Sequence, residues 1–396
     1  MAWAERISSR GWRARYRDGE GQIHTAGYAS TERKALLLGQ GQEASIRAGT
    51  WFDPNAGKVT FADYFEKQWV GNRVGEVNTI SMYWSHYRTA LKPAFGDMQL
   101  RRILPSTVQG WVAQMQRDGV TPGTIKARVK ALQAILAAKK GASALRDKLI
   151  QFNPVAGVEL PYAPEPEVEI YTPDESDALL AAMDPWWRAL PLFALEAGAR
   201  WGEVMGVRVE DFTFGMRSVT LRRTIVENST ANTGTGTPFM WKEYPKGKRP
   251  RKVALSREAS TAVTELIAAR GLGPEDRLFS MPDKTLPPNW HPPLTLEWTP
   301  RRTDAWPEGL PIARAHFRKY VWLHAISTAE VPVRTFHDLR ASHISWLLAG
   351  GADLPTVMER VGHTQFQTTR RYTAVLEEAD DRALEALSSI RARYSG

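Results

Sequence analysis

The sequence predicts a multidomain α+β protein that is mainly helical and carries small β-sheets. The chain has 396 residues, more than one domain usually holds. Short alternating runs near the N-terminus are typical of strands, whereas most of the later sequence places apolar residues at helical spacing. The composition, 43% hydrophobic and 24% charged, is that of a globular protein rather than a disordered or fibrous one.

Charge and composition narrow the class of function. The formal net charge is +9 and the pI about 9.6, which favours a polyanionic partner, nucleic acid before membrane. The absence of cysteine excludes disulfides, thiolate nucleophiles and sulfur-ligated metal sites. We expect no metal and no cofactor. No segment is typical of a secretory signal or a membrane span, so a cytoplasmic protein is expected.

Residues 1–57 form the first predicted domain. The runs 12–17 and 22–28 are typical of strands around a turn at 18–21, and a helical stretch follows from Thr31 to about Gly49. Alternate residues of the first run are basic, and two interpretations stay open. These side chains enter a DNA groove, or they protect a solvated edge strand by their charge; they are Arg13, Arg15 and Arg17.

Residues 58–165 are predicted to form a helical domain. Phe61, Tyr64, Phe65 and Trp69 recur at helical spacing, and we interpret them as core. Residues 101–148 hold ten Lys or Arg against two acids, which favours contact with phosphates over a merely solvated face. The residues predicted to bind DNA here are Arg101, Arg102, Lys126, Arg128, Lys130, Lys139 and Lys140.

The third predicted domain is residues 166–396, after a proline-rich linker that begins near Asn153. Helices are expected at about 174–199, strands within 218–255, and mainly helices from there to the end. The segment 282–311 is rich in Pro and Trp and is expected to be a long loop or insertion. The end of the chain, 374–394, is amphipathic and packs either on a neighbouring protomer or on its own core.

The C-terminal part contains the most informative pattern. Thr335 and Asp338 fit a capping box at a helix start, which would place His337 and Arg340 on one face. Gly350-Gly351 should end that helix. A short helix is then expected from about Leu354 to Arg360, with Gly362 stopping it just before His363. The chain reaches Tyr372 nine residues later, close enough to bring a phenol to the same place.

Two earlier turns carry further basic groups. Gly198-Ala199-Arg200 separates two helical stretches and exposes the guanidinium, and the turn 245–248 between two strand-like runs predicts a hairpin carrying Lys246. Singly, such residues are more often surface ion-pair partners, solvated lysines or hydrogen-bonded core histidines. Two Arg, one Lys, two His and one Tyr together suit attack on a phosphodiester, because guanidinium groups match phosphoryl oxygens.

The order and spacing of these motifs resemble those of the tyrosine recombinases, or phage-type integrases. GARWGE, the PKGK turn, HDLR, VGH and the terminal Tyr occur in the family's order. The resemblance implies that Glu203 is structural and that Lys242 and Lys248 compete with Lys246 for one role. It assigns catalysis to Arg200, Lys246, His337, Arg340, His363 and Tyr372.

The same resemblance implies a fold and a reaction. Residues 1–57 are similar to three-stranded arm-binding domains, 58–165 to the helical core-binding domain, and 166–396 to the mixed α/β catalytic domain. A 3′-phosphotyrosyl intermediate, a Holliday junction and a homotetramer on two DNA sites are implied, without a cofactor. A host DNA-bending factor, an excision factor and a location in a bacterial nucleoid, in the host of a phage or other integrative element, are expected. The alternatives are a type IB topoisomerase-like or telomere-resolving enzyme and a catalytically silent DNA-binding regulator.

Overall fold

The computed structural model describes residues 1–8, 11–53, 56–165, 167–229, 232, 237–247, 249–281, 311–370 and 372. The chain divides into two compact units, Met1–Pro164 and Glu165–Gly396. Helices make up most of the regular structure of the described residues, with three small sheets, so the predicted mainly helical α+β class is confirmed. Nearly all of the segment 282–311, the amphipathic end 374–394 and Lys248 lie outside the described residues.

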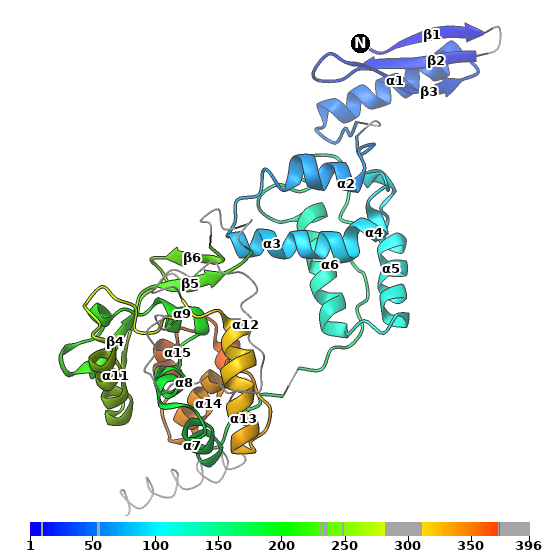
Figure 1. The fold of residues 1–396 in the computed structure, drawn as a ribbon. Helices are drawn as coiled ribbons and strands as arrows, with labels where there is room; N and C mark the ends of the chain where they lie inside the picture. Colours follow the sequence, from blue (N-terminus) through cyan, green and yellow to red (C-terminus); the bar gives the residue numbers. More distant parts are fainter. Residues whose placement is uncertain are drawn as a thin grey trace, which may run out of the picture. The chain divides into compact units, whose positions relative to one another are not determined.

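The first unit begins with a three-stranded antiparallel sheet and one helix (Figure 1). Its elements are β1 (Trp3–Ser8), β2 (Gly11–Arg17), β3 (Ile23–Ala29) and α1 (Glu32–Arg47). The predicted hairpin is therefore confirmed as β2 and β3. Because β2 is the central strand, the interpretation of its arginines as protection of an edge is wrong.

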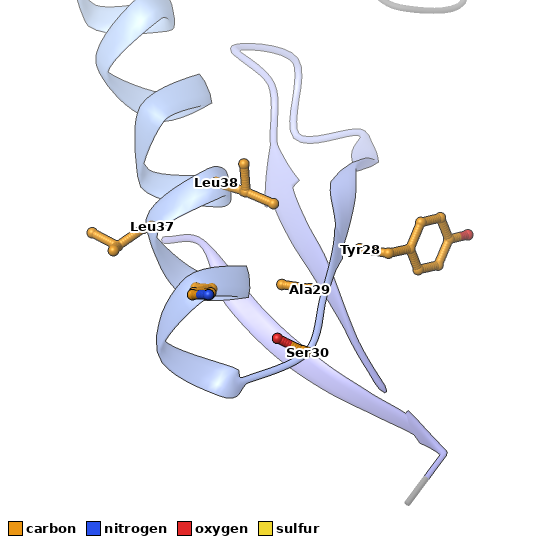
Figure 2. A pocket seen from close by; sticks show the side chains of 6 residues that line it. Tyr28, Ala29, Ser30, Leu37 and Leu38 are labelled. Atoms are coloured by element: carbon orange, nitrogen blue, oxygen red, sulfur yellow. The ribbon is translucent and has the colours of Figure 1, made fainter. Parts of the chain in front are cut away.

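Alternation along β2 sorts its side chains between two faces. Ala14 and Tyr16 are fully buried, whereas Arg13, Arg15 and Arg17 remain partly or largely exposed on the opposite face. An open hollow of about 520 Å³ lies on this module between the end of β3 and the start of α1. Figure 2 shows the side chains that line it. It is lined by Tyr28, Ala29, Ser30, Lys34, Leu37 and Leu38.

The rest of the first unit is helical. Its elements are α2 (Phe61–Tyr64), which continues as a wider turn to Trp69, α3 (Val77–His86), which continues likewise to Leu91, α4 (Lys92–Phe95), α5 (Pro105–Arg117) and α6 (Pro122–Ala137). The predicted aromatic core is confirmed, since Phe61, Tyr64, Phe65 and Trp69 are all fully buried. The buried Trp69 indole is paired, since it donates to the Ala142 carbonyl at 2.9 Å.

The second unit begins after an irregular stretch, since no helix or strand occurs in 158–165 or 167–172. Its elements are α7 (Pro173–Ala181), α8 (Pro185–Ala197), α9 (Trp201–Gly206), β4 (Ser218–Leu221), β5 (Thr224–Glu227), β6 (Phe239–Lys242), β7 (Arg251–Ala254), α11 (Arg257–Arg270), α12 (Arg314–Phe317), which continues to Trp322, α13 (Leu323–Ala329), α14 (Asp338–Ala349), α15 (Leu354–Val361) and α16 (Phe366–Arg370). Most of these elements contribute side chains to one hydrophobic core, which includes Phe193 of α8.

The strands of this unit form two separate antiparallel pairs, β4 with β7 and β5 with β6. Because β6 and β7 do not pair with each other, the prediction that residues 245–248 form a hairpin tip is wrong. The segment joins two sheets instead. The predicted helix ends are confirmed: α14 ends before Gly350, and α15 ends at Gly362 in a left-handed conformation with φ 69°.

Candidate active site

Arg200 stands at the N-terminus of α9, directly after the turn that ends α8. Gly198 makes this turn with a left-handed backbone, φ 55° and ψ 32°, which glycine adopts without a Cβ penalty. The Arg200 backbone N–H donates to Glu203 Oε2 at 2.9 Å, and its Nη1 donates to Glu203 Oε1 at 3.0 Å. The Arg200 side chain is 24% exposed. One edge of its guanidinium is therefore held by Glu203, and the side chain remains partly accessible to solvent.

Glu203 is the buried anion of the site. It is 1% exposed, and both of its oxygens also accept from Arg251 of β7, Oε1 from Nη1 at 3.0 Å and Oε2 from Nη2 at 2.7 Å. Burial by itself would raise the pKa of Glu203, but the hydrogen bonds and charge of Arg251, with the charge of Arg200, hold that pKa at about 2. The carboxylate is therefore ionised across the neutral pH range.

The sequence reasoning missed Arg251. Its side chain is 7% exposed, and its Nε also donates to the carbonyl of Arg360 at 2.9 Å. The burial of β7 alternates, with Arg251 and Val253 inside, so the apolar residue two positions later was the available signal. The structure adds a cation that links α9, β7 and α15.

Arg340 lies in the first turn of α14 and is 1% exposed. Its two terminal nitrogens donate to the carbonyls of Gly198 and Val361, which join α14 to the turns that carry Arg200 and His363. Burial lowers the pKa of Arg340, and the charge of Arg200 lowers it further, to about 9. The guanidinium is still charged at neutral pH.

His337 is the N-cap residue of α14 and is exposed. The predicted capping box is present in part: Asp338 Oδ2 accepts from the Thr335 backbone N–H at 2.7 Å and from the Thr335 hydroxyl, but the Asp338 N–H donates to the Thr335 carbonyl and not to its hydroxyl. Desolvation by the surrounding protein lowers the pKa of His337, and nearby cations lower it further, in the order Arg340, Arg200 and Lys246. The imidazole is thus favoured in its neutral form.

His363 follows the left-handed Gly362 and is half-buried. Its backbone N–H donates to the Met358 carbonyl at 2.9 Å, and its Nδ1 is 2.9 Å from the Thr369 hydroxyl oxygen. Burial and the charge of Arg340 lower the pKa of His363 to about 3, with Arg200 and Arg251 contributing. At neutral pH this ring is uncharged and positioned by Thr369.

Tyr372 lies beside His363. The two ring centroids are 6.4 Å apart, and the ring planes differ by 22°. The phenol packs against the small cluster of Ile344, Val357 and Val361, and the Tyr372 N–H donates to the Thr369 carbonyl at 3.0 Å. The last turn before Tyr372 therefore orients both the histidine and the phenol.

Lys246 is exposed on the segment that joins β6 to β7. An added Cβ at the next residue, Gly247, would be 3.9 Å from the Gly362 carbonyl, so this turn lies next to the end of α15. Lys246 also lowers the pKa of His337 by its charge. Its competitor Lys242 is the last residue of β6, opposite Thr224.

The structure thus gathers all six predicted catalytic residues at one place. Arg200 and Arg251 pair with the buried carboxylate of Glu203, Arg340 lies close enough for its charge to interact with that carboxylate, and the neighbouring histidines are favoured in their neutral forms. The excess positive charge suits a phosphodiester, whose non-bridging oxygens accept from guanidinium groups.

Among the described residues no group of three or more His, Asp or Glu could hold a metal ion. The helices of the described residues are also too short or too polar to span a membrane.

The predicted DNA-binding residues all lie in the first unit. On the sheet, Arg13 and Arg15 are both paired with Glu5, at 2.6 and 3.4 Å. Arg128 is half-buried and donates to the Met115 sulfur at 3.6 Å. The other predicted residues are exposed and form no ion pair in the part of the chain that the structure describes; they are Arg17, Arg101, Arg102, Lys126, Lys130, Lys139 and Lys140.

Comparison with known proteins assigns a family. The model of the phage integrase family matches residues 169–379, just over half of the chain. The integrase of Mycobacterium phage D29 is 24% identical over 338 residues, which cover 85% of this chain and 80% of the relative. A XerC-like tyrosine recombinase of Caldanaerobacter subterraneus is 24% identical over 323 residues, covering 79% and 78%.

Solved structures show the same fold. The Tn1549 transposon integrase in complex with transposon right end DNA has a TM-score of 0.62 at 18% identity, over 83% of this chain and 100% of that chain. A lambda integrase tetramer bound to a Holliday junction has a TM-score of 0.52 at 16% identity, over 93% and 96%. The resemblance inferred from the sequence is confirmed: this chain belongs to the phage integrase family and is a tyrosine-type site-specific recombinase.

Proposed function

We propose that this chain cuts and rejoins DNA through a phosphotyrosyl intermediate formed by Tyr372. The phenol oxygen attacks the scissile phosphorus, the new bond joins that oxygen to the 3′-phosphate, and the bond to the 5′-oxygen breaks. The observation that carries this proposal is the position of Tyr372 beside His363, close to the guanidinium groups of Arg200 and Arg340. Because the phosphotyrosyl bond keeps the phosphodiester energy, rejoining needs no nucleotide cofactor.

The neighbouring groups divide the remaining work. Arg200 and Arg340 hold the non-bridging oxygens, whose charge grows in the pentacoordinate transition state, and His363 adds a hydrogen bond there. His337, favoured in its neutral form, accepts the phenol proton, which Tyr372 must lose because the reference pKa of tyrosine is about 10. Lys246 donates a proton to the departing 5′-oxygen. Rejoining runs the same steps in reverse.

We propose three functional domains, with residues 1–57 binding outlying arm sites, 58–165 binding the core site and 166–396 catalysing the reaction. The first two carry the predicted DNA-binding residues, and the third carries the candidate active site. The Tn1549 integrase was solved with transposon end DNA, and lambda integrase as a tetramer on a Holliday junction. By analogy this chain acts as a homotetramer on two duplexes, with a DNA-bending host factor and an excision factor.

A covalent adduct tests the proposal. The full chain is incubated with a nicked duplex carrying its core attachment site, mapped from the junctions of the integrated element, with EDTA present. We expect a protein–DNA adduct on a denaturing gel, and we expect Tyr372→Phe to bind the same duplex but form none. Cleavage by Tyr372→Phe would refute the nucleophile assignment. Tight binding by the wild type without any adduct would favour a catalytically silent regulator.

A further inference from the structure

We propose that Arg251 is a positioning residue that keeps Arg200 available to the scissile phosphate by sharing the negative charge of Glu203. The proposal rests on the function proposed above, in which Arg200 holds the phosphate. Arg251 itself contacts neither DNA nor the nucleophile in this scheme. It acts through the carboxylate that it shares with Arg200.

The geometry around Glu203 shows how the charge is divided. Oε1 accepts from Nη1 of Arg200 and from Nη1 of Arg251, both at 3.0 Å. Oε2 accepts from the Arg200 backbone N–H at 2.9 Å and from Nη2 of Arg251 at 2.7 Å. Arg251 therefore forms a bidentate ion pair with the Glu203 carboxylate, whereas the Arg200 guanidinium donates only one hydrogen bond to it.

The burial of Glu203 means that losing one of its two arginine partners has a large energetic cost. Glu203 is 1% exposed, so water cannot take the place of a lost partner, and an unpaired buried carboxylate is costly. Arg340 is the other cation close to Glu203, but both of its terminal nitrogens already donate to backbone carbonyls. Without Arg251, Arg200 is the cation that can turn to cover both oxygens. A guanidinium turned inward no longer faces the phosphate.

The same side chain supports a second catalytic segment. Nε of Arg251 donates to the Arg360 carbonyl at 2.9 Å, in the last turn of α15. A Cβ at Gly362, the residue before His363, would be 3.3 Å from Arg251 Cδ. Replacing Arg251 by Met keeps most of this aliphatic contact and removes the charge. Any effect that depends on Glu203 can therefore be separated from an effect of packing.

The test compares adduct formation by full-length Arg251→Met, Arg251→Lys, Glu203→Gln and the double variant Glu203→Gln with Arg251→Met. The substrate is the nicked core-site duplex on which the wild type forms its adduct. We expect Arg251→Met to bind this duplex normally and to form adduct about 100-fold more slowly, the loss typical of one oxyanion-stabilising donor. Adding Glu203→Gln should restore about tenfold, because Arg200 then has no carboxylate to cover, and such a rescue is strongly non-additive.

Arg223→Met is the matched control. Arg223 is 11% exposed and paired with Asp211, Glu210 and Glu243, so its loss also breaks a largely buried ion pair in the same unit. We expect it to lower the unfolding temperature without the selective loss of cleavage. Arg251→Lys, which keeps the charge with fewer donors, should fall between the wild type and Arg251→Met.

Several outcomes overturn the inference. Additive losses in the double variant would show that Arg251 acts by packing alone, and wild-type cleavage by Arg251→Met would show that it does not position Arg200. If Arg251→Met does not fold, the double variant and Arg251→Lys decide: once Glu203 is replaced, loss of Arg251 should cost no further cleavage, so a double variant clearly slower than Glu203→Gln would overturn the inference. Failure of the wild type itself to form an adduct would refute the proposed function instead, and the inference with it.

Discussion

At the scale of single residues, the candidate site is governed by which charges are buried together. Glu203 keeps its charge because Arg251 and Arg200 offset its burial, and His363 loses its charge because burial and Arg340 disfavour the imidazolium. The pKa of Glu203 is lowered in the folded state, so this carboxylate stabilises the fold above its unfolded pKa near 4.5. That contribution is lost as the pH falls toward about 2.

Glu5 offers a test at the same scale in the N-terminal sheet. Its carboxylate pairs with Arg13 and Arg15, two of the residues proposed to contact arm DNA, and Arg13 holds the pKa of Glu5 below its usual range. We expect Glu5→Gln to tighten binding to arm-site duplex about two- to tenfold, with a steeper salt dependence, because two arginines become free for phosphates. Equilibrium binding at several salt concentrations measures both.

Glu20→Gln is the control for net charge. Glu20 is exposed in the turn between β2 and β3. Its replacement by Gln changes the net charge by the same amount as Glu5→Gln but does not release Arg13 or Arg15. Equal effects of the two substitutions would indicate that only the net charge matters. No effect of Glu5→Gln would count against this face of the sheet as the arm-binding surface.

At the scale of elements, the ends of helices place the catalytic groups. Gly198 ends α8 just before Arg200, and Gly362 ends α15 just before His363, both with left-handed backbone. These stops are local, and the glycine pattern predicted both of them. The pairing of β6 with β5 and of β7 with β4 depends on contacts between distant residues, and the sequence pattern predicted a hairpin instead.

Gly362→Ala tests the role of the second stop. A Cβ there meets Arg251 side-chain atoms at 3.3 Å, and the left-handed conformation costs a non-glycine residue about 1–2 kcal/mol. We expect a loss of stability of that order in denaturant unfolding and a marked loss of adduct formation, because both His363 and Arg251 must shift.

Gly271→Ala separates the two effects. Gly271 ends α11 with φ 62°, and nothing lies within 4 Å of its added Cβ. We expect a similar loss of stability but normal adduct formation. If both substitutions reduced cleavage equally, the effect would come from stability alone and not from the geometry at Gly362.

At the scale of the whole molecule, residues 1–53 of the N-terminal module are held together by contacts with one another. The Trp51 indole donates to the Tyr16 hydroxyl at 2.9 Å, and His24 lies 2.7 Å from Asp18. Gly57, by contrast, is tied to the helical part, since its carbonyl accepts from the Arg101 N–H at 3.1 Å. A deletion that ends before Gly57 therefore removes the module and spares this contact.

Removing residues 1–53 tests the division of DNA binding. We expect the shortened chain to lose affinity for duplexes carrying arm sites while it keeps core-site binding and adduct formation. Gel-shift titrations on separate arm-site and core-site duplexes measure the two affinities. An equal loss on both duplexes would contradict a separate arm-binding domain.

The sequence by itself determined the fold class, the strands around the turn at 18–21, the aromatic core of the helical part and the ends of α14 and α15. These follow from local signals, namely alternation, helical spacing and glycine stops, which act within a few residues. It also named six residues that the structure gathers in one place, because their order and spacing resemble a known family.

Only the tertiary structure decided that Arg251 shares Glu203 with Arg200, that Arg340 is buried between two carbonyls, and that Glu5 occupies two of the predicted DNA-binding arginines. Each depends on segments brought together across the fold, Glu203 and Arg251 lying 48 residues apart. No local periodicity specifies which buried cation faces which carboxylate. That choice is made when the strands pair and the core closes around them.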